Sequence, residues 1–208
     1  MLSDPPPGQV DDTAIVVATT YLRLFAMPKP VRITGRSSSI TNAFVNGVIP
    51  AVVPTEDEVR EALGILDMLG EVTCAYCGDA STEWDHLRPL VDRQRPTGYI
   101  SEIRNLVPAC GKCNQSKGNK PWRAWMYSEA PRSPKRRGVV DIDDRAERLT
   151  RFEQWGTPAR IDFAAVVGED LWQSHWEHHA RLLTLMREAE ETAREIRGRV
   201  REFHDGQG

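Results

Sequence analysis

Apolar residues recur at helical spacing in three stretches of this chain. The first stretch, residues 13–26, predicts a helix near the start of the chain. The second, residues 55–69, opens with Thr55 and has Glu58 three positions later, which together form the capping box of a helix N-terminus. The third covers residues 170–205, where apolar residues recur at steps of three and four. That stripe predicts a helix on the order of 45 Å long.

Between the helical stretches the pattern changes to short strands, turns and breakers. We therefore expect one small core with mostly helical extensions on both sides. The expected segments are a flexible tail at residues 1–12, a helical N-terminal segment at 13–69, a core of strands, turns and a helix at 70–127, a linker and mixed segment at 128–169, and a long C-terminal helix at 170–205.

Composition changes this picture mainly through the distribution of charge. The 208 residues carry a net charge of −3, yet residues 86–137 hold 12 basic and 3 acidic side chains. Acidic side chains predominate before and after that segment. A basic region between acidic flanks favours a polyanionic partner, although a solvated basic face is the alternative. No apolar run reaches the 18 to 20 or so residues of a membrane span, and no basic leader precedes residues 14–18, so we expect a cytoplasmic protein.

The four cysteines form two Cys-x2-Cys pairs separated by 32 residues. Two such pairs supply four thiolates that can surround one tetrahedral Zn²⁺, and disulfides are disfavoured inside a cell. We therefore predict a structural zinc site made of Cys74, Cys77, Cys110 and Cys113. Zinc of this kind stabilises a fold and does not by itself indicate catalysis.

Three further motifs lie between and after the cysteine pairs: Asp85-His86, Asn105-Leu106 and Cys113-Asn114. In this order they resemble the HNH endonuclease family over residues 72–127. The resemblance implies an α+β fold, with a small, treble-clef-like ββα-metal core held by zinc. It also implies a catalytic Mg²⁺ or Mn²⁺ and hydrolysis of DNA phosphodiester bonds to 5′-phosphate and 3′-hydroxyl ends.

The resemblance also assigns roles to individual residues. His86 matches the general base that activates water, a role that suits an imidazole near neutral pH. Asp85 and Asn114 match the ligands of the catalytic metal, and their oxygens are hard donors suited to Mg²⁺ or Mn²⁺. Asn105 matches a catalytic-site residue that holds the loop and the imidazole through hydrogen bonds to backbone. Asn114 stands where the family name suggests histidine, which leaves the metal preference open.

Each assignment has a structural alternative. His86 can be a buried structural histidine, and both asparagines can be turn or cap residues. The expected nucleic-acid contacts can instead form a solvated face; they are Arg88, Lys112, Lys117, Lys120 and Arg123. We expect the tryptophans at positions 84, 122 and 125 to be core residues, and the histidines at 175, 178 and 179 to lie on the surface.

The main prediction is a DNA endonuclease of bacterial restriction or defence type, with double-stranded DNA as its partner. Its long C-terminal helix would pair two subunits, so that two active sites meet two strands. Alternatives are a homing or phage-type nicking nuclease, a zinc-containing DNA-binding module without catalysis, and an enzyme acting on RNA.

Overall fold

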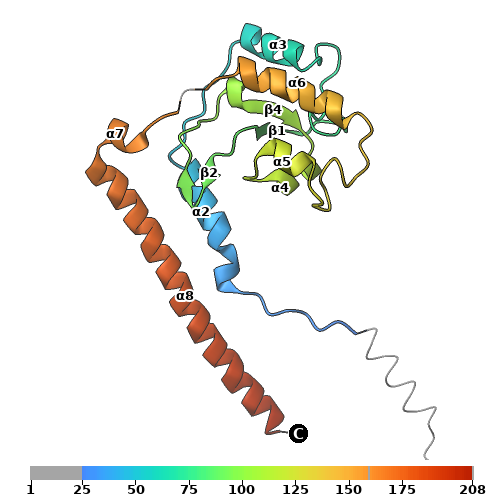
Figure 1. The fold of residues 1–208 in the computed structure, drawn as a ribbon. Coiled ribbons are helices and arrows are strands. Elements are labelled where there is room, and N and C mark those ends of the chain that lie inside the picture. The colour runs from blue at the N-terminus through green and yellow to red at the C-terminus, as the bar shows by residue number, and fades with distance from the viewer. Residues whose placement is uncertain (1–24, 159, 208) are drawn as a thin grey trace, which may run out of the picture. The chain divides into compact units, whose positions relative to one another are not determined.

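The computed structural model describes residues 25–158 and 160–207. The chain divides into two compact units, Met1–Arg32 and Ile33–Gly208. The predicted tail at 1–12 and residues 13–24 of the first predicted helix lie outside the described residues. Residues 25–32 contain no helix or strand. The second unit contains the cysteine pairs and the motifs that lie between and after them (Figure 1).

The second unit begins with three short helical elements. These are the 3-10 helix η1 (Ile33–Arg36), α2 (Ser37–Asn46) and α3 (Glu56–Ile65). The capping box is confirmed, because the Thr55 side chain accepts from the Glu58 amide and the Glu58 carboxylate accepts from the Thr55 amide. The helix ends at Ile65, however, before the predicted end at Leu69. Asp67 adopts a left-handed φ of 56°, and the Met68 amide then donates to the Leu63 carbonyl, which closes the helix.

The predicted α+β core is confirmed. Strand β1 (Glu83–His86) pairs antiparallel with β4 (Leu106–Ala109), and α4 (Gly111–Lys117) follows β4 directly. The connection between the two strands contains a small hairpin, β2 (Val91–Asp92) and β3 (Arg95–Pro96), and the 3-10 helix η2 (Ile103–Asn105). The short helix α5 (Trp122–Met126) completes this region. The order of β1, β4 and α4 is that of a ββα unit.

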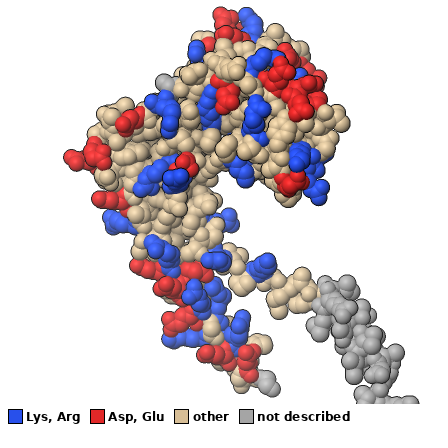
Figure 2. Space-filling view, in the orientation of Figure 1, with Lys and Arg blue, Asp and Glu red and all other residues tan. Residues whose placement is uncertain are grey.

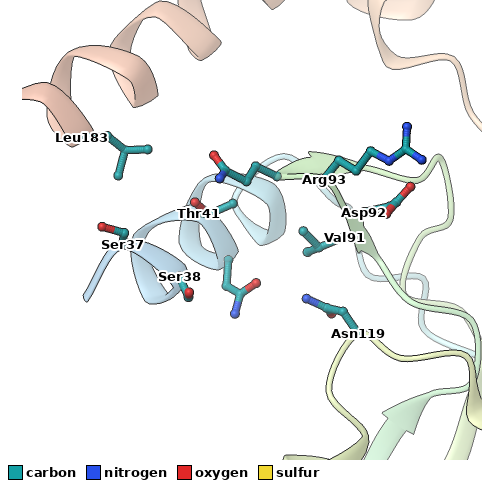
Figure 3. A pocket seen from close by; sticks show the side chains of 10 residues that line it. Ser37, Ser38, Thr41, Val91, Asp92, Arg93, Asn119 and Leu183 are labelled. Atoms are coloured by element: carbon teal, nitrogen blue, oxygen red, sulfur yellow. The ribbon is translucent and has the colours of Figure 1, made fainter. Parts of the chain in front are cut away.

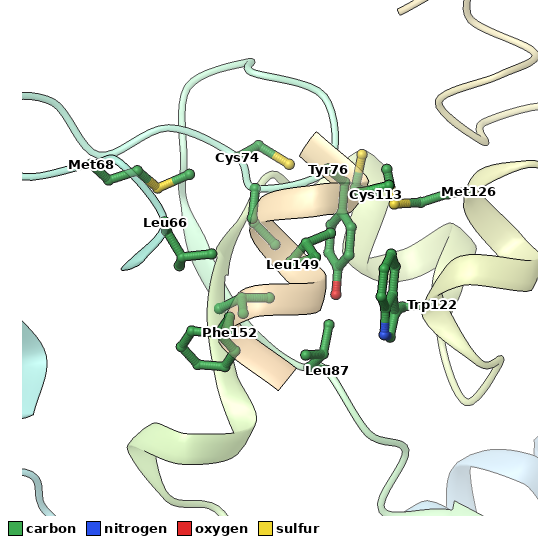
Figure 4. Close-up of a cluster of buried hydrophobic side chains, with 14 of the residues drawn as sticks. Leu66, Met68, Cys74, Tyr76, Leu87, Cys113, Trp122, Met126, Leu149 and Phe152 are labelled. Carbon is green, nitrogen blue, oxygen red and sulfur yellow. The ribbon is translucent and has the colours of Figure 1, made fainter. Parts of the chain in front are cut away.

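The main hydrophobic core surrounds this ββα unit (Figure 4). Side chains from the cysteine pairs, α3 and α5 meet there, including the fully buried Tyr76 and Trp125. Helix α6 (Ile142–Trp155) also belongs to this core, because it contributes Ala146, Leu149 and Phe152. This helix lies within the stretch 128–169, for which the sequence predicted a linker and a mixed segment without naming a helix. Its apolar residues recur at steps of three and four from Ile142 to Trp155, so one face of the helix packs against the core.

Two further helices complete the unit. They are α7 (Phe163–Val167) and α8 (Glu169–Asp205), which at 37 residues is about 55 Å long. Trp176 of α8 packs in a second cluster with Val45, Leu90 and Val91. Farther along, Ile196, Val200 and Phe203 are mostly exposed. Acidic side chains gather over the part of the molecule where α3 and α6 lie, and both signs of charge alternate along α8 (Figure 2).

Several aromatic and histidine positions differ from expectation. Trp122 and Trp125 are buried as predicted, but Trp84 is 42% exposed because it lies on the outer face of β1. His179 is buried, not on the surface, and its Nε2 is 2.9 Å from the Thr41 hydroxyl. His175 Nε2 lies 3.1 Å from the Phe44 carbonyl. These two histidines therefore tie α8 to α2. Among the described helices, none is both long and apolar enough to cross a membrane.

Candidate metal centre and active site

The four cysteines come together at one point of the fold. Their sulfur atoms all lie within 4.8 Å of one another, and the Cys77 and Cys110 sulfurs are 3.7 Å apart. Zinc–sulfur bonds of about 2.3 Å in a tetrahedron would place the sulfurs about 3.8 Å apart. Each pair is folded as a tight turn, since the Gly78 amide donates to the Cys74 carbonyl and the Cys113 amide to the Cys110 carbonyl. The residues present therefore fit a structural zinc ion.

The electrostatics of the four thiols support the same conclusion. Hydrogen bonds from Cys113 and Cys74 hold the pKa of Cys77 well below its ordinary value. The same contacts with Cys74 and Cys77 raise the pKa of Cys113. Neighbouring thiolates repel one another, so ionising one sulfur opposes ionising the next. Only a cation at the centre allows all four to be thiolates together.

One basic residue near the cysteines was not predicted as part of this centre. Arg137 lies 3.5 Å from the Cys113 sulfur, and it also forms an ion pair with Asp79 at 2.7 Å. Hydrogen bonding to the Cys77 sulfur raises the pKa of this guanidinium. The only signal in the sequence was the basic run at residues 135–137, which was assigned to a linker.

Asp85 lies on the inner face of β1 and is only 5% exposed. Its Oδ2 accepts a hydrogen bond of 2.6 Å from the Tyr76 hydroxyl and lies 3.1 Å from the Lys117 ammonium. Burial raises the pKa of Asp85, and the Lys117 charge partly opposes that shift. Tyr76 belongs to the first cysteine turn, so this hydrogen bond links the metal centre directly to β1. The sequence offered no sign of that role for Tyr76.

His86 follows Asp85 and ends β1. Its Nε2 lies 2.8 Å from the Ser101 hydroxyl, a partner that the sequence did not indicate. Burial, together with the nearby Lys117 charge, lowers the pKa of His86 to about 4. The imidazole is therefore neutral at pH 7, which is the form that a general base requires.

Asn105 holds the chain that follows His86. Its Oδ1 accepts from the Arg88 amide at 2.9 Å, and its Nδ2 donates to the Arg88 carbonyl at 3.2 Å. The Asn105 carbonyl also accepts from the Leu87 amide at 2.8 Å. Asn105 is completely buried, so these bonds are shielded from water. The geometry suits a loop-holding role, and a part in catalysis stays a prediction.

Asn114 lies on α4, on the side that meets β1. Its Nδ2 donates to the carboxylate of Glu83, two residues before Asp85 on the same strand. Lys117, one turn farther along α4, meets Asp85 in the same way. Across the contact of β1 with α4, Glu83 thus pairs with Asn114, and Asp85 pairs with Lys117. Asp85 and Asn114 therefore lie at this contact, whereas the His86 imidazole has its hydrogen-bonding partner, Ser101, outside β1 and α4.

The predicted nucleic-acid contacts occupy different environments. Lys112 and Lys120 are exposed on or just after α4. Arg123 is also exposed, and it contacts Thr150 and the Trp122 ring. Arg88 is largely enclosed, because its guanidinium donates to the Glu153 carbonyl at 2.7 Å. Lys117 is fully buried, so the expectation that it contacts phosphate is replaced by its pairing with Asp85.

Comparison with known proteins agrees with this geometry. The family model described as HNH endonuclease matches residues 74–120. The CRISPR-associated endonuclease Cas9 of Corynebacterium diphtheriae is 41% identical over 91 residues, which cover 39% of this chain and 8% of that protein. The chain thus spans less than a tenth of the length of this relative. No solved structure matches the chain. Residues 74–120, which run from the first cysteine pair through α4, form an HNH endonuclease domain.

Proposed function

We propose that this chain is a metal-dependent endonuclease that hydrolyses phosphodiester bonds in DNA. The observation that carries the proposal is the contact between β1 and α4, beside the four cysteines. Asp85 and His86 lie on that strand, and Asn114 lies on that helix. A neutral imidazole can serve as the general base of phosphodiester hydrolysis, and hard oxygen donors can hold the metal ion.

In this proposal His86 accepts a proton from the attacking water through its neutral imidazole. Asp85 and Asn114 would hold a Mg²⁺ or Mn²⁺ ion, which when bound supplies a positive charge that stabilises the phosphate in the transition state. Carboxylate and amide oxygens suit such an ion, which would have to share or displace the Lys117 ammonium that lies 3.1 Å from Asp85 Oδ2. Asn105 keeps the loop after His86 in place through its two bonds to Arg88.

A defence role of restriction type is the more specific part of the proposal. The relative from Corynebacterium diphtheriae is a CRISPR-associated endonuclease, which supports a role against foreign DNA. We also propose that two chains pair through the exposed apolar residues of α8, among them Ile196 and Val200. Two active sites would then meet the two strands of one duplex.

The test compares wild-type protein with His86→Ala on supercoiled plasmid in Mg²⁺ or Mn²⁺. Losing the general base should slow cleavage by about 10²- to 10⁴-fold. Zinc content, the circular dichroism spectrum and duplex binding should remain those of wild type. Ser101→Ala is the matched control, because it removes the hydrogen-bonding partner of the imidazole and keeps the general base. Its cleavage rate should therefore fall less than that of His86→Ala. Equal cleavage by His86→Ala and wild type would remove the proposed mechanism.

A second candidate function is favoured by the contacts of Asp85. Tyr76 and Lys117 already satisfy this carboxylate, as expected in a zinc-containing DNA-binding module without catalysis. The two functions make opposite predictions for wild-type protein. Plasmid binding without cleavage in Mg²⁺ and in Mn²⁺ would favour the module, and cleavage abolished by EDTA would favour the nuclease.

A further inference from the structure

The small hairpin between β1 and β4 has an unusual turn. Arg93 and Gln94 join β2 to β3, and their φ angles are 45° and 65°. Two-residue hairpin turns with positive φ at both positions are usually built from Asn-Gly or Gly-Gly. Large side chains at both positions cost conformational energy, and such strain persists only where the surroundings enforce it.

The body of the protein holds this hairpin in place from two sides. Leu90 and Val91 pack in the second hydrophobic cluster with Trp176 of α8. The guanidinium of Arg95 lies 4.2 Å from the centre of the Trp176 ring, a cation–π contact. The Thr97 hydroxyl donates to the Pro89 carbonyl at 2.7 Å. The strained turn is therefore presented on a rigid base.

A cavity of about 330 Å³ opens beside the turn (Figure 3). Val91 and Leu183 provide apolar parts of its lining, and most other lining groups are polar. Three of these groups are amides, from Asn42 on α2, Gln94 in the turn, and Asn119 just after α4. Asn119 lies two residues beyond Lys117, so the cavity adjoins the end of the HNH domain.

Arg93 stands at the rim of this cavity and is exposed. Within the described residues its guanidinium forms no hydrogen bond or ion pair. Asp92 beside it is the one acidic group among the described lining residues. An unpaired arginine next to several amides is a combination suited to nucleic acid, since arginine binds phosphate while amides recognise base edges.

We propose that the hairpin turn and its cavity contact the DNA duplex beside the cleavage site and set sequence preference. Arg93 binds a backbone phosphate, and Gln94, with Asn42 and Asn119, faces base edges. This inference rests on the proposed function, because it concerns the same DNA. It adds a recognition surface outside the ββα unit, held by α2 and α8.

The experiment uses the full chain with zinc and measures binding to a 30-base-pair duplex, without divalent cations other than zinc, across a range of salt concentrations. Arg93→Ala should weaken binding about 5- to 10-fold. The slope of the logarithm of the binding constant against the logarithm of salt concentration should become shallower by the amount that one lost phosphate contact gives. Arg60→Ala is the matched control, because Arg60 is an exposed arginine on α3 that pairs with Glu56 and Asp57. Its affinity should stay within about twofold of wild type.

Gln94→Gly separates recognition from folding. Glycine accepts the positive φ without strain, so the melting temperature should stay level or rise by about 2 °C. The sequences at cleaved ends should nevertheless become less selective, because the amide is lost. Wild-type affinity in Arg93→Ala together with unchanged cut sites in Gln94→Gly would overturn the inference. Failure of the wild-type chain to cleave or bind any DNA would instead overturn the proposed function.

Discussion

Lys117 shows how one side chain can be misjudged when only its neighbours in sequence are known. Its ammonium lies 3.1 Å from Asp85 Oδ2 and donates to the carbonyls of His86 and Gly118 at 2.7 and 3.2 Å. The side chain is completely buried, and burial lowers the pKa of the ammonium. Removing one partner of a buried ion pair leaves the other charge without compensation.

We therefore expect Lys117→Met to lower the free energy of unfolding by about 3 to 5 kcal/mol. The exposed Lys120→Met is the matched control and should change it by less than about 0.5 kcal/mol. Urea denaturation measures both. Because Asp85 would then lack a cation, millimolar Mg²⁺ should stabilise Lys117→Met more than wild type. Equal stability of the two variants would show that the pair does not support the fold.

At the scale of elements, the helices differ in how well the sequence alone predicts their ends and their buried faces. The capping box of α3 is local, so Thr55 and Glu58 predicted it correctly. Helix α6 buries three of its fourteen residues, and their place in the core became clear only from the tertiary structure. The apolar stripe of α8 predicted the helix, but it did not predict which part is buried. Trp176 is buried, whereas Ile196, Val200 and Phe203 are exposed.

The predicted dimer forms through the exposed apolar residues of α8. Val200→Glu places a charge within the apolar stripe and should convert a dimer into a monomer, as measured by light scattering after size exclusion. Gly198→Glu is the control, because position 198 lies on the opposite face of the helix and a Cβ atom added there meets nothing within 4 Å. A wild-type chain that is monomeric at all concentrations tested would contradict pairing through α8.

At the scale of the whole molecule, the four-cysteine centre joins segments that are distant in sequence. Arg145 of α6 donates to the Cys74 carbonyl at 3.2 Å, and Arg137 reaches the Cys113 sulfur. Three of the four cysteines are themselves members of the main hydrophobic core. The strands, α4 and α6 therefore depend on one centre for their arrangement.

Removal of zinc by a strong chelator should consequently abolish the tertiary structure of the core. Near-ultraviolet circular dichroism should lose the signals of Tyr76 and Trp125, which are in edge-to-face contact. Zinc should restore these signals when added back, and Mg²⁺ should not. An unchanged spectrum after complete zinc loss, measured by metal analysis, would contradict a structural role for the ion.

Local patterns in the sequence indicated the cysteine centre, the capping box of α3 and the long C-terminal helix, and the resemblance to a known family implied the ββα unit. Each of those local patterns depends on residues close in sequence or on a spacing that metal or helix geometry imposes. Only the tertiary structure decided that Tyr76 and Lys117 share Asp85, that Glu83 meets Asn114, and that α6 enters the core. The side-chain contacts join residues that are 9 to 32 positions apart in the sequence. Burial determines which side chains become partners, and no local sequence pattern records burial.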